Sequence, residues 1–590
     1  MSKSAPVSKS VEGWHAGRRE RWDEFAVWVF VALIVVKVLW GYWQRDLTFG
    51  DTASYFVKAV SWHQFGRVNI VWSPLYTAYY GCWLWITENA RWATLLHRVL
   101  LIFLSTGLVA WIGLRTLPKI LALGLATWWI ALPIHYDTLY EVHLFGAVPI
   151  LAIVAMAVSM RSEKWRDPLT LGVAVVTTLL IRNEYSILVV VLACTALWRL
   201  RRERNENGAR AAWAGAGRYA ICLVVAAALF ALFFDLSYAK GDDLKRESSI
   251  KHTLNMCQVY AFGYQQRHAE WTKSPWTDCA GLMQETFGER EPTLAQMIAA
   301  NPAEVARHFL WNLQLVRAGA EVLLTNATWS DNNPDYVPVL RQTLWPTLIL
   351  AVTLVILLWG GARIRVGNDA YALQARAHFS RIAPLLAGLI LVAIAVVLTQ
   401  RPRPSYQLAQ GAIYLWLVAL CLPAFVPAIL RWIERPAIYV AGTALLLLAP
   451  PYAMLPLGSK GGLVTAYYES LLPQASTLCA DEVKWLATDY AGELSMYLCA
   501  PYRTSANAEP KIGDTAETFP TSAWTDPRRF VEEVGKRGYR IATIDVFFLD
   551  RFGKAGSCEG FAGAFADAGW HVANTPVTHA DECIFMYVRN

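Results

Sequence analysis

Apolar stretches recur along most of the chain and alternate with short polar segments, many of them basic. The first covers residues 25–43, which is long enough for a helix to cross the hydrocarbon core of a bilayer. Ten further apolar stretches follow it, at residues 94–114, 120–133, 142–160, 169–181, 186–198, 220–238, 344–359, 382–398, 408–429 and 437–455. Several are shorter than the roughly 20 residues of an upright spanning helix, so we expect tilted or broken helices.

The first loop, residues 45–93, has a different pattern. Residues 51–65 predict an amphipathic helix, in which Tyr55 and Trp62 are apolar and Lys58 is polar. Residues 72–86 are apolar but rich in Trp and Tyr, which favour the membrane–water interface. We therefore interpret residues 72–86 as an interfacial helix. An ordinary second span is the alternative.

The basic loops decide between these alternatives. If the N-terminus is cytoplasmic and residues 72–86 do not span, the basic loops at 115–119, 161–166, 199–204, 363–381 and 431–435 all lie on the cytoplasmic side. Counting residues 72–86 as a span would place every one of them outside, against the positive-inside rule. The pattern predicts a multi-pass protein of the cell membrane, of the bacterial inner-membrane type, with a cytoplasmic N-terminus.

Composition agrees with a membrane protein. Of the 590 residues, 55% are hydrophobic and 27 are Trp. The net charge of +7 is accounted for by the basic loops, so no nucleic-acid partner is expected. Residues 25–43 are longer than a signal-peptide core and lack a small-residue cleavage site, so we expect them to remain as an anchor.

Two water-exposed regions complete the predicted organisation. The large outer loop, residues 239–341, carries helical patterns at 292–300 and 302–317. Residues 457–590 predict a small α/β domain with helices at 526–538 and 561–569 and strands at 539–548 and 583–588. The fold class is thus an all-α polytopic membrane protein, with about 11 transmembrane helices plus interfacial helices and a small α/β C-terminal extracytoplasmic domain. The predicted divisions are a cytoplasmic tail (1–24), a transmembrane domain (25–456) and the C-terminal domain (457–590).

The cysteines follow the predicted sidedness. Four lie in or beside apolar helices: Cys82, Cys194, Cys222 and Cys421. The other six fall in outer segments as sequence-local pairs: Cys257 and Cys279, Cys479 and Cys499, Cys558 and Cys583. An even number on the oxidising side predicts three disulfides, although the sequence alone leaves their connectivity open.

Acidic candidates for chemistry lie at the predicted outer face. Asp51 opens the amphipathic segment of the first loop. Asp137 and Glu141 are four residues apart, which places them on one face of a helix, and His143 is close by. Either carboxylate is also suited to capping the helix, and His143 to a packed or hydrogen-bonded role.

Basic candidates lie at the same face. Arg182 and Glu184 sit between two short apolar stretches, where ionisable groups are costly unless they pair with each other or serve a function. Arg401 and Arg403 lie outside, against the positive-inside trend, and Tyr406 follows them at a helix start. Paired arginines at a lipid interface suit a phosphate held by bidentate contacts.

Together these residues resemble the GT-C superfamily of membrane glycosyltransferases, most closely its protein mannosyltransferase and aminoarabinose transferase branch. The segments GDTASYFVKAV and WSPLYTAYYG match the first outer loop of that family in order and spacing. Arg98, in LLHRVLL, matches the family arginine at the head of the next span. Asp137 or Glu141 corresponds to the acidic residue of the second outer loop, and Arg403 with Tyr406 to an outer Arg-x-x-Tyr.

The resemblance covers roughly the first two hundred residues plus 400–414, and it has departures. Asp51 stands alone where many relatives carry Asp-Glu, and Ser73-Pro74 replaces Pro-Pro. The large outer loop and the cysteine-bearing C-terminal domain match no named branch. The protein that the resemblance implies takes a sugar from a polyprenyl-phosphate donor in the membrane and passes it to a glycan, lipid or protein acceptor.

The resemblance also implies roles for residues. Asp51 would be the general base on an acceptor hydroxyl that attacks the anomeric carbon with inversion. Asp137 or Glu141 would orient a substrate or help to hold a divalent cation, Mg²⁺ or Mn²⁺, and no cofactor is certain. Arg403, helped by Arg401 or Lys58, would stabilise the departing phosphate. The predicted substrate-binding set is Lys58, Arg98, His143, Arg182, Glu184, Arg401, Arg403 and Tyr406.

Two other classes of function remain open. Interrupted helices with membrane-depth charges occur in transporters and flippases, but the chain shows no internal repeat and its charges gather at one face. A membrane-anchored binding or assembly protein would use the outer domain, which shows no site of its own. A binding or transport role predicts no release of lipid phosphate, and an enzyme predicts it.

Overall fold

The computed structural model describes most of the 590-residue chain. The described residues are 24–40, 47, 51–66, 73–132, 141–160, 162–237, 242–275, 278–325, 344–425, 463–479, 485–486, 496–502, 523, 526–544, 557–573, 577–579 and 582–589.

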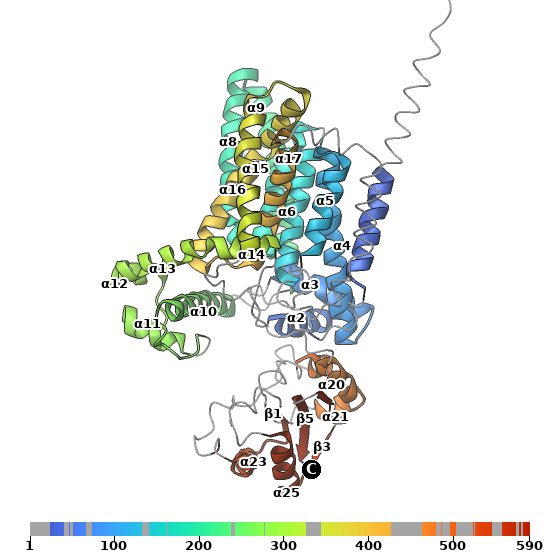
Figure 1. The fold of residues 1–590 in the computed structure, drawn as a ribbon, viewed down its shortest axis with the longest axis vertical. Helices are drawn as coiled ribbons and strands as arrows, with labels where there is room; N and C mark the ends of the chain where they lie inside the picture. The colour runs from blue at the N-terminus through green and yellow to red at the C-terminus, as the bar shows by residue number, and fades with distance from the viewer. Residues whose placement is uncertain are drawn as a thin grey trace, which may run out of the picture.

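Long helices form an elongated bundle (Figure 1). After a helix over residues 24–38, the bundle helices are α4 (Ala90–Thr116), α5 (Lys119–Ala131), α6 (Glu141–Ser159), α7 (Glu163–Leu180), α8 (Ser186–Asn207), α9 (Ala209–Ser237), α15 (Leu344–Val366), α16 (Ala370–Gln400) and α17 (Leu408–Phe425). Ten of the eleven predicted spans are therefore helical, and the eleventh, 437–455, lies outside the described residues. Seven helices of the described chain are long and apolar enough to cross a membrane.

The exposure pattern of the bundle is that of a protein embedded in lipid. Leu358 on α15 is 75% exposed and Val224 on α9 is 66% exposed, although each helix contains an apolar stretch long enough to cross a membrane. Where helices meet, small residues allow close approach: a Cβ at Gly360 would lie 2.4 Å from the Cys421 carbonyl oxygen, and one at Gly113 2.9 Å from Cα of Ala122. The predicted fold class, a polytopic helical membrane protein with a small C-terminal sheet, is confirmed.

The first loop forms two short helices across one end of the bundle, α2 (Asp51–Phe65) and α3 (Pro74–Cys82), followed by the 3-10 turn η3 (Trp83–Trp85) (Figure 1). With nine residues, α3 rises only about 13 Å, less than half of the hydrocarbon core. The described part of residues 72–86 therefore does not form a second span. Their position at the lipid interface stays a prediction.

The large outer loop is helical in its described parts and lies at the same end of the bundle as α2 (Figure 1). Its helices are α10 (Asp242–Arg267), α11 (Cys279–Phe287), α12 (Leu294–Ala300), α13 (Pro302–Gln314) and α14 (Val316–Thr325). Thr293 and Gln296 form a reciprocal capping box at the start of α12, and Asn301 caps α13. Both helices predicted in this loop are present, and α10, α11 and α14 are additional.

The C-terminal region combines helices with a small sheet. Its elements are α20 (Leu463–Leu471), η8 (Leu472–Gln474), α21 (Ala475–Leu478), β1 (Trp485–Leu486), η9 (Ala500–Tyr502), α23 (Pro527–Lys536), β2 (Ile541–Ile544), α25 (Cys558–Asp567), β3 (Trp570–Val572), β4 (Val577–His579) and β5 (Glu582–Arg589). β1 pairs parallel with β2, and β5 pairs antiparallel with β2, β3 and β4. Both predicted helices and both predicted strands are present. Gly538, with φ of 73°, ends the α23 segment as predicted.

Two of the predicted disulfides are present, Cys257–Cys279 and Cys479–Cys499. Cys558 is also disulfide-bonded, and the side chain of Cys583 lies outside the described part of the structure. Cys82, Cys194, Cys222 and Cys421 are free thiols; the first two are exposed at the surface of the protein and the other two are buried inside it.

The bundle has two dissimilar ends. One carries α2, α3, the outer-loop helices and the C-terminal region, and the other carries the connections from α8 to α9 and from α15 to α16 (Figure 1). This segregation places the predicted outer and cytoplasmic loops at opposite ends. Which end faces the cytoplasm stays a prediction.

Candidate functional site

A buried ion pair joins α4 and α6 at the end that carries α2. Arg98 pairs with Glu141, the first residue of α6, and each side chain is only 2% exposed. The hydroxyl of Thr52 donates to the other carboxylate oxygen of Glu141 at 3.1 Å. Thr52 directly follows Asp51, so this carboxylate fixes the first turn of α2 against the bundle.

Aromatic residues of α3 hold it against α4. The Nδ1 of His97 lies 3.0 Å from the Ala93 carbonyl oxygen, to which it donates, so Nε2 accepts from the Tyr76 hydroxyl at 3.0 Å. The Tyr80 hydroxyl shares a 2.5 Å hydrogen bond with Thr94. Burial raises the pKa of both Tyr76 and Tyr80, so each side chain stays a neutral phenol.

Arg182, between α7 and α8, makes a second polar cluster. Its guanidinium bonds Glu184, with Nε to Oε1 at 2.5 Å, and also His143 of α6. Burial lowers the pKa of Arg182, but the adjacent Glu184 carboxylate outweighs this and the pKa is raised overall. Gly146 makes room, because a Cβ there would lie 2.9 Å from Cγ of Arg182.

Tyr406 connects this cluster to the turn before α17, where η6 spans Pro404–Gln407. The guanidinium carbons of Arg182 and Arg403 lie 4.6 Å and 5.0 Å from the centre of the Tyr406 ring. His143 packs against the same ring, with the ring centres 4.7 Å apart. Two cationic groups from distant parts of the sequence therefore meet at one aromatic ring.

Arg401 and Arg403 are close together in the sequence, but their side chains contact different parts of the structure. Arg401 is 3% exposed, and its guanidinium lies 4.5 Å from the centre of the Phe262 ring on α10. Its φ of 58° is in the left-handed region, which a side chain other than glycine rarely adopts. This turn sends Arg401 toward the outer-loop helices and Arg403 toward Tyr406.

Ser73 is the other described non-glycine residue with a positive φ, at 54°. It precedes Pro74, the first residue of α3, and its hydroxyl donates to the Ile181 carbonyl oxygen at 2.6 Å. Ile181 is the residue before Arg182. Strained backbone of this kind persists where the surroundings hold it, and here it ties α3 to the Arg182 cluster.

The remaining predicted residues are placed less completely. Asp51 is the first residue of α2, but its side chain lies outside the described part, and Asp137 lies outside it altogether. Lys58 is a half-buried residue of α2. The structure thus gathers Arg98, Glu141, His143, Arg182, Glu184, Arg403 and Tyr406 at the end that carries α2.

The C-terminal region covers α2 on its other side. The Phe56 and Tyr497 rings lie 5.0 Å apart, and the Gln64 side chain donates to the Pro501 carbonyl oxygen at 3.0 Å. Arg91 pairs with Glu469 of α20 at 2.5 Å. The helix that begins at Asp51 is therefore held between the bundle and the C-terminal region.

No group of three or more potential His, Cys, Asp or Glu metal ligands forms among the described residues. Glu141 and Glu184 are both engaged by arginines. The option of Mg²⁺ or Mn²⁺ stays a prediction.

Sequence reasoning missed Thr52, Ser73 and His97 as residues that shape this site. All three lie inside segments that carry the family resemblance, His97 in LLHRVLL beside Arg98, and that was the available signal. No protein-family model matches the sequence, and no curated protein sequence matches it. The crystal structure of ArnT from Cupriavidus metallidurans bound to undecaprenyl phosphate is similar over 95% of this chain and 97% of that chain, with 13% sequence identity and a TM-score of 0.35.

Proposed function

We propose that this protein is an integral membrane glycosyltransferase that moves a sugar from a polyprenyl-phosphate donor to an acceptor hydroxyl at the extracytoplasmic face. The single observation that carries the proposal is the convergence of Arg182 and Arg403 on the Tyr406 ring, beside His143. These groups sit at one end of a membrane bundle, where a lipid phosphate would lie. Two guanidinium groups supply the fork-like donors that phosphate oxygens accept.

The leaving group explains why arginines are needed. When the bond between the anomeric carbon and the phosphate oxygen breaks, its electron pair stays on the phosphate. That group is already ionised at neutral pH, so it needs positive charge rather than a proton. Arg403 and Arg182 provide that charge. Glu184 and His143 hold the Arg182 guanidinium in place.

The acceptor side needs a base. Asp51, at the start of α2, takes the proton of the acceptor hydroxyl. As it does so, the hydroxyl oxygen of the acceptor bonds to the anomeric carbon of the sugar, and the configuration at that carbon is inverted. Asp51 is next to Thr52, whose hydroxyl is bonded to Glu141. We assign Glu141 and Arg98 the role of positioning α2, because their shared ion pair is buried and leaves Glu141 no role as a base. Asp137 stays a candidate for orienting a substrate.

The proposal is tested by incubating the purified protein with a panel of polyprenyl-phosphate sugars and an acceptor mixture, and measuring the polyprenyl phosphate released. Wild-type protein should release it from at least one donor. Arg182→Gln and Arg403→Ala should weaken donor binding as well as turnover, because the phosphate is present in ground and transition states alike.

Arg202→Gln is the matched control, since Arg202 is an exposed arginine of α8 whose carboxylate partner is Glu206. It should leave release unchanged. An equal loss in the Arg202 and Arg403 variants would show that general charge, not the Tyr406 cluster, matters. Transport of an intact lipid-linked sugar without release would contradict the proposal.

A further inference from the structure

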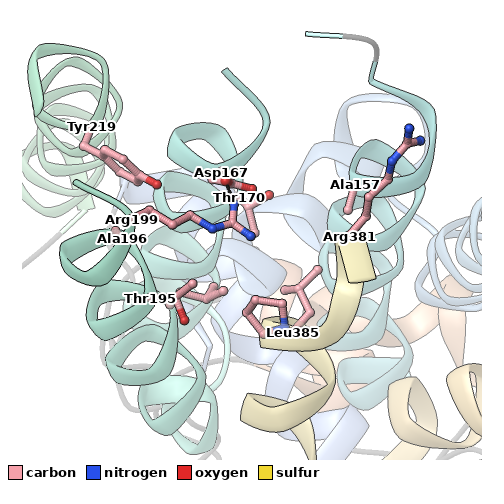
Figure 2. Close-up of a pocket in the computed structure, with 11 residues that line it drawn as sticks. Ala157, Asp167, Thr170, Thr195, Ala196, Arg199, Tyr219, Arg381 and Leu385 are labelled. Carbon is pink, nitrogen blue, oxygen red and sulfur yellow. Dashed lines mark ion pairs between the residues drawn. The ribbon is translucent and has the colours of Figure 1, made fainter. Parts of the chain in front are cut away.

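The cavity between α7, α8, α9 and α16, at the end of the bundle opposite to α2, is too small for a ligand. Its volume is about 20 Å³, enough for about one water molecule. Arg199 pairs there with Asp167, and Figure 2 shows Arg381 directed away from both. The exposed face of α13, at the end that carries α2, is a surface of a different kind.

Helix α13 leaves the bundle sideways. Figure 1 shows α13 running across the direction of the bundle helices, near the level where α16 ends, and shows α10 farther from the bundle than α13. Helix α13 packs against both α10 and α16. It has no contact with the Tyr406 ring among the described contacts, and it has no part in the proposed transfer.

One face of α13 packs on α10. The Glu304 carboxylate pairs with Arg267 of α10 at 2.7 Å. Four residues later, the His308 ring is fully buried, and its centre lies 5.5 Å from that of the Tyr260 ring on α10. Residues four apart share one face of a helix. Glu304 is the only acidic residue of α13, so the negative charge of this helix lies on the face toward α10.

The opposite face of α13 is apolar and exposed. Leu310 is 59% exposed and Leu313 is 48% exposed, and both lie roughly half a turn around the helix from Glu304 and His308. Ala306, which is also exposed, lies between them on this face. Because α10 covers the side of α13 that is away from the bundle, the apolar face is turned back toward the level of the bundle helices (Figure 1).

The contact with α16 gives the level of α13 relative to the lipid. The side chain of Asn312 donates to the Leu398 carbonyl oxygen at 2.9 Å. Leu398 lies about 6 Å along α16 beyond Ile394, which is 48% exposed on the apolar surface of that helix. Helix α13 therefore meets the bundle where the lipid-exposed surface of α16 ends, at the boundary between hydrocarbon and head groups.

Basic residues flank the apolar face. The side chain of Arg307 is 71% exposed, and that of Arg317, at the start of α14, is 44% exposed. Each lies 3.4 Å from a glutamate of its own helix, so lipid phosphates would be an additional partner. An apolar helix face with arginines beside it is typical of a helix that lies in a membrane surface.

We propose that α13 docks on the surface of the lipid bilayer beside the bundle, at the end that carries α2. Leu310 and Leu313 insert among the acyl chains, and Arg307 and Arg317 lie at the level of the phosphates. The lipid surface covers the apolar face and meets the flanking positive charge at the same time.

The docked helix also restrains the turn that carries Arg401 and Arg403. Helix α14 follows α13 directly, and a Cβ at Gly319 would lie 2.4 Å from the Pro402 carbonyl oxygen, so the two backbones are in close contact. Asn312 reaches the end of α16 just before the same turn. Docking of α13 on lipid thus fixes the outer loop at the place where it touches this turn.

Lipid contact is measured with the full chain in nanodiscs that hold one copy each. Leu310→Cys, Leu313→Cys and Glu285→Cys are labelled with an environment-sensitive fluorophore in a background of Cys82→Ser and Cys194→Ser. Phosphatidylcholine with a doxyl group high on its acyl chain should quench the probes at 310 and 313 about twofold or more above the probe at 285, because an interfacial helix lies about 5–10 Å into the head-group boundary.

Glu285 is the matched control, since it is an exposed residue of α11, a helix that lies farther from the bundle than α13 (Figure 1). Both leucines are exposed, so their replacement leaves the packing of α13 on α10 intact. Quenching at 310 and 313 that does not exceed quenching at 285 overturns the proposal. So does shielding of these probes only in nanodiscs that hold two copies, since the face would then bind a second copy of the chain. The assay contains no sugar donor, so its result is independent of the proposed transfer.

Discussion

The ion pair between Arg98 and Glu141 makes the sharpest prediction about stability. Glu141→Gln keeps the size of the side chain and an acceptor for Thr52, but it removes the negative charge. Arg98, 2% exposed, then loses the carboxylate that Glu141 supplies. Removing one partner of a buried ion pair costs about 3–5 kcal/mol, which corresponds to a factor of about 10² to 10⁴ in the unfolding equilibrium.

Arg98→Met should cost a similar amount, because it leaves the Glu141 carboxylate buried without the guanidinium that pairs with it. The double variant, Arg98→Met with Glu141→Gln, should recover most of that loss, since replacing both members of a buried pair by neutral groups is often close to neutral. The two single effects should therefore be far from additive.

Equilibrium unfolding of the protein in bicelles by added SDS measures these free energies. Glu206→Gln is the control, because the Arg202–Glu206 pair is exposed and should contribute less than about 1 kcal/mol. If Glu141→Gln were as stable as the wild type, or if the two single losses added up in the double variant, no buried charge pair would hold α4 to α6 and α2.

Three further outcomes are expected. His308 of α13 is fully buried, and this burial lowers its pKa to about 3, with the nearby Arg267 and Arg401 charges contributing. The stability that the neutral His308 contributes is therefore fully present above the unfolded-state pKa of about 6.5. It declines by roughly 1.4 kcal/mol per pH unit as the pH falls from there toward 3. The protection factors of the α13 amides, which compare observed with intrinsic exchange rates at each pH, should fall with acid in the wild type and less steeply in His308→Gln. Equal slopes in the two proteins would show that another group titrates. Reducing Cys479–Cys499 should speed hydrogen exchange in α2, because that disulfide joins α21 to the segment that contacts Phe56; unchanged exchange would mean that α2 is held by the bundle alone. Cysteines placed at residues 201 and 285 should react with impermeant reagents from opposite sides of the membrane, and labelling of both from one side would refute the predicted sidedness.

Local pattern was enough to predict most helices. Some bundle helices extend beyond the predicted apolar cores because a polar residue caps their first turn. Helix α4 starts at Ala90, four residues before the predicted span, since Asn89 accepts from two backbone amides of the first turn. Strands of two or three residues, such as β1 and β3, escaped prediction because their stability comes from pairing with β2 and β5, distant in sequence.

The candidate site was only partly predictable. Arginines and carboxylates at one membrane face are visible in the sequence, but which arginine meets which carboxylate depends on packing across long separations. Arg98 pairs with Glu141 of α6, and the local sequence around Arg98 does not mark that partner. Neighbours along the chain diverge as well: Arg401 and Arg403 contact different rings because the turn between them is in a conformation that no sequence pattern marks.

Asp51→Asn provides the most direct measurement of lipid-linked sugar transfer at this face. Polyprenyl phosphate released per protein molecule is compared between the wild type and the variant at saturating donor, and donor binding is measured in parallel. The substitution keeps shape and hydrogen bonding at the start of α2 but removes the proton acceptor. Release should fall about a hundred- to ten-thousandfold, with donor binding retained. Release by Asp51→Asn at the wild-type rate would contradict the assignment of the base, and no release by the wild type from any donor would contradict the transferase itself.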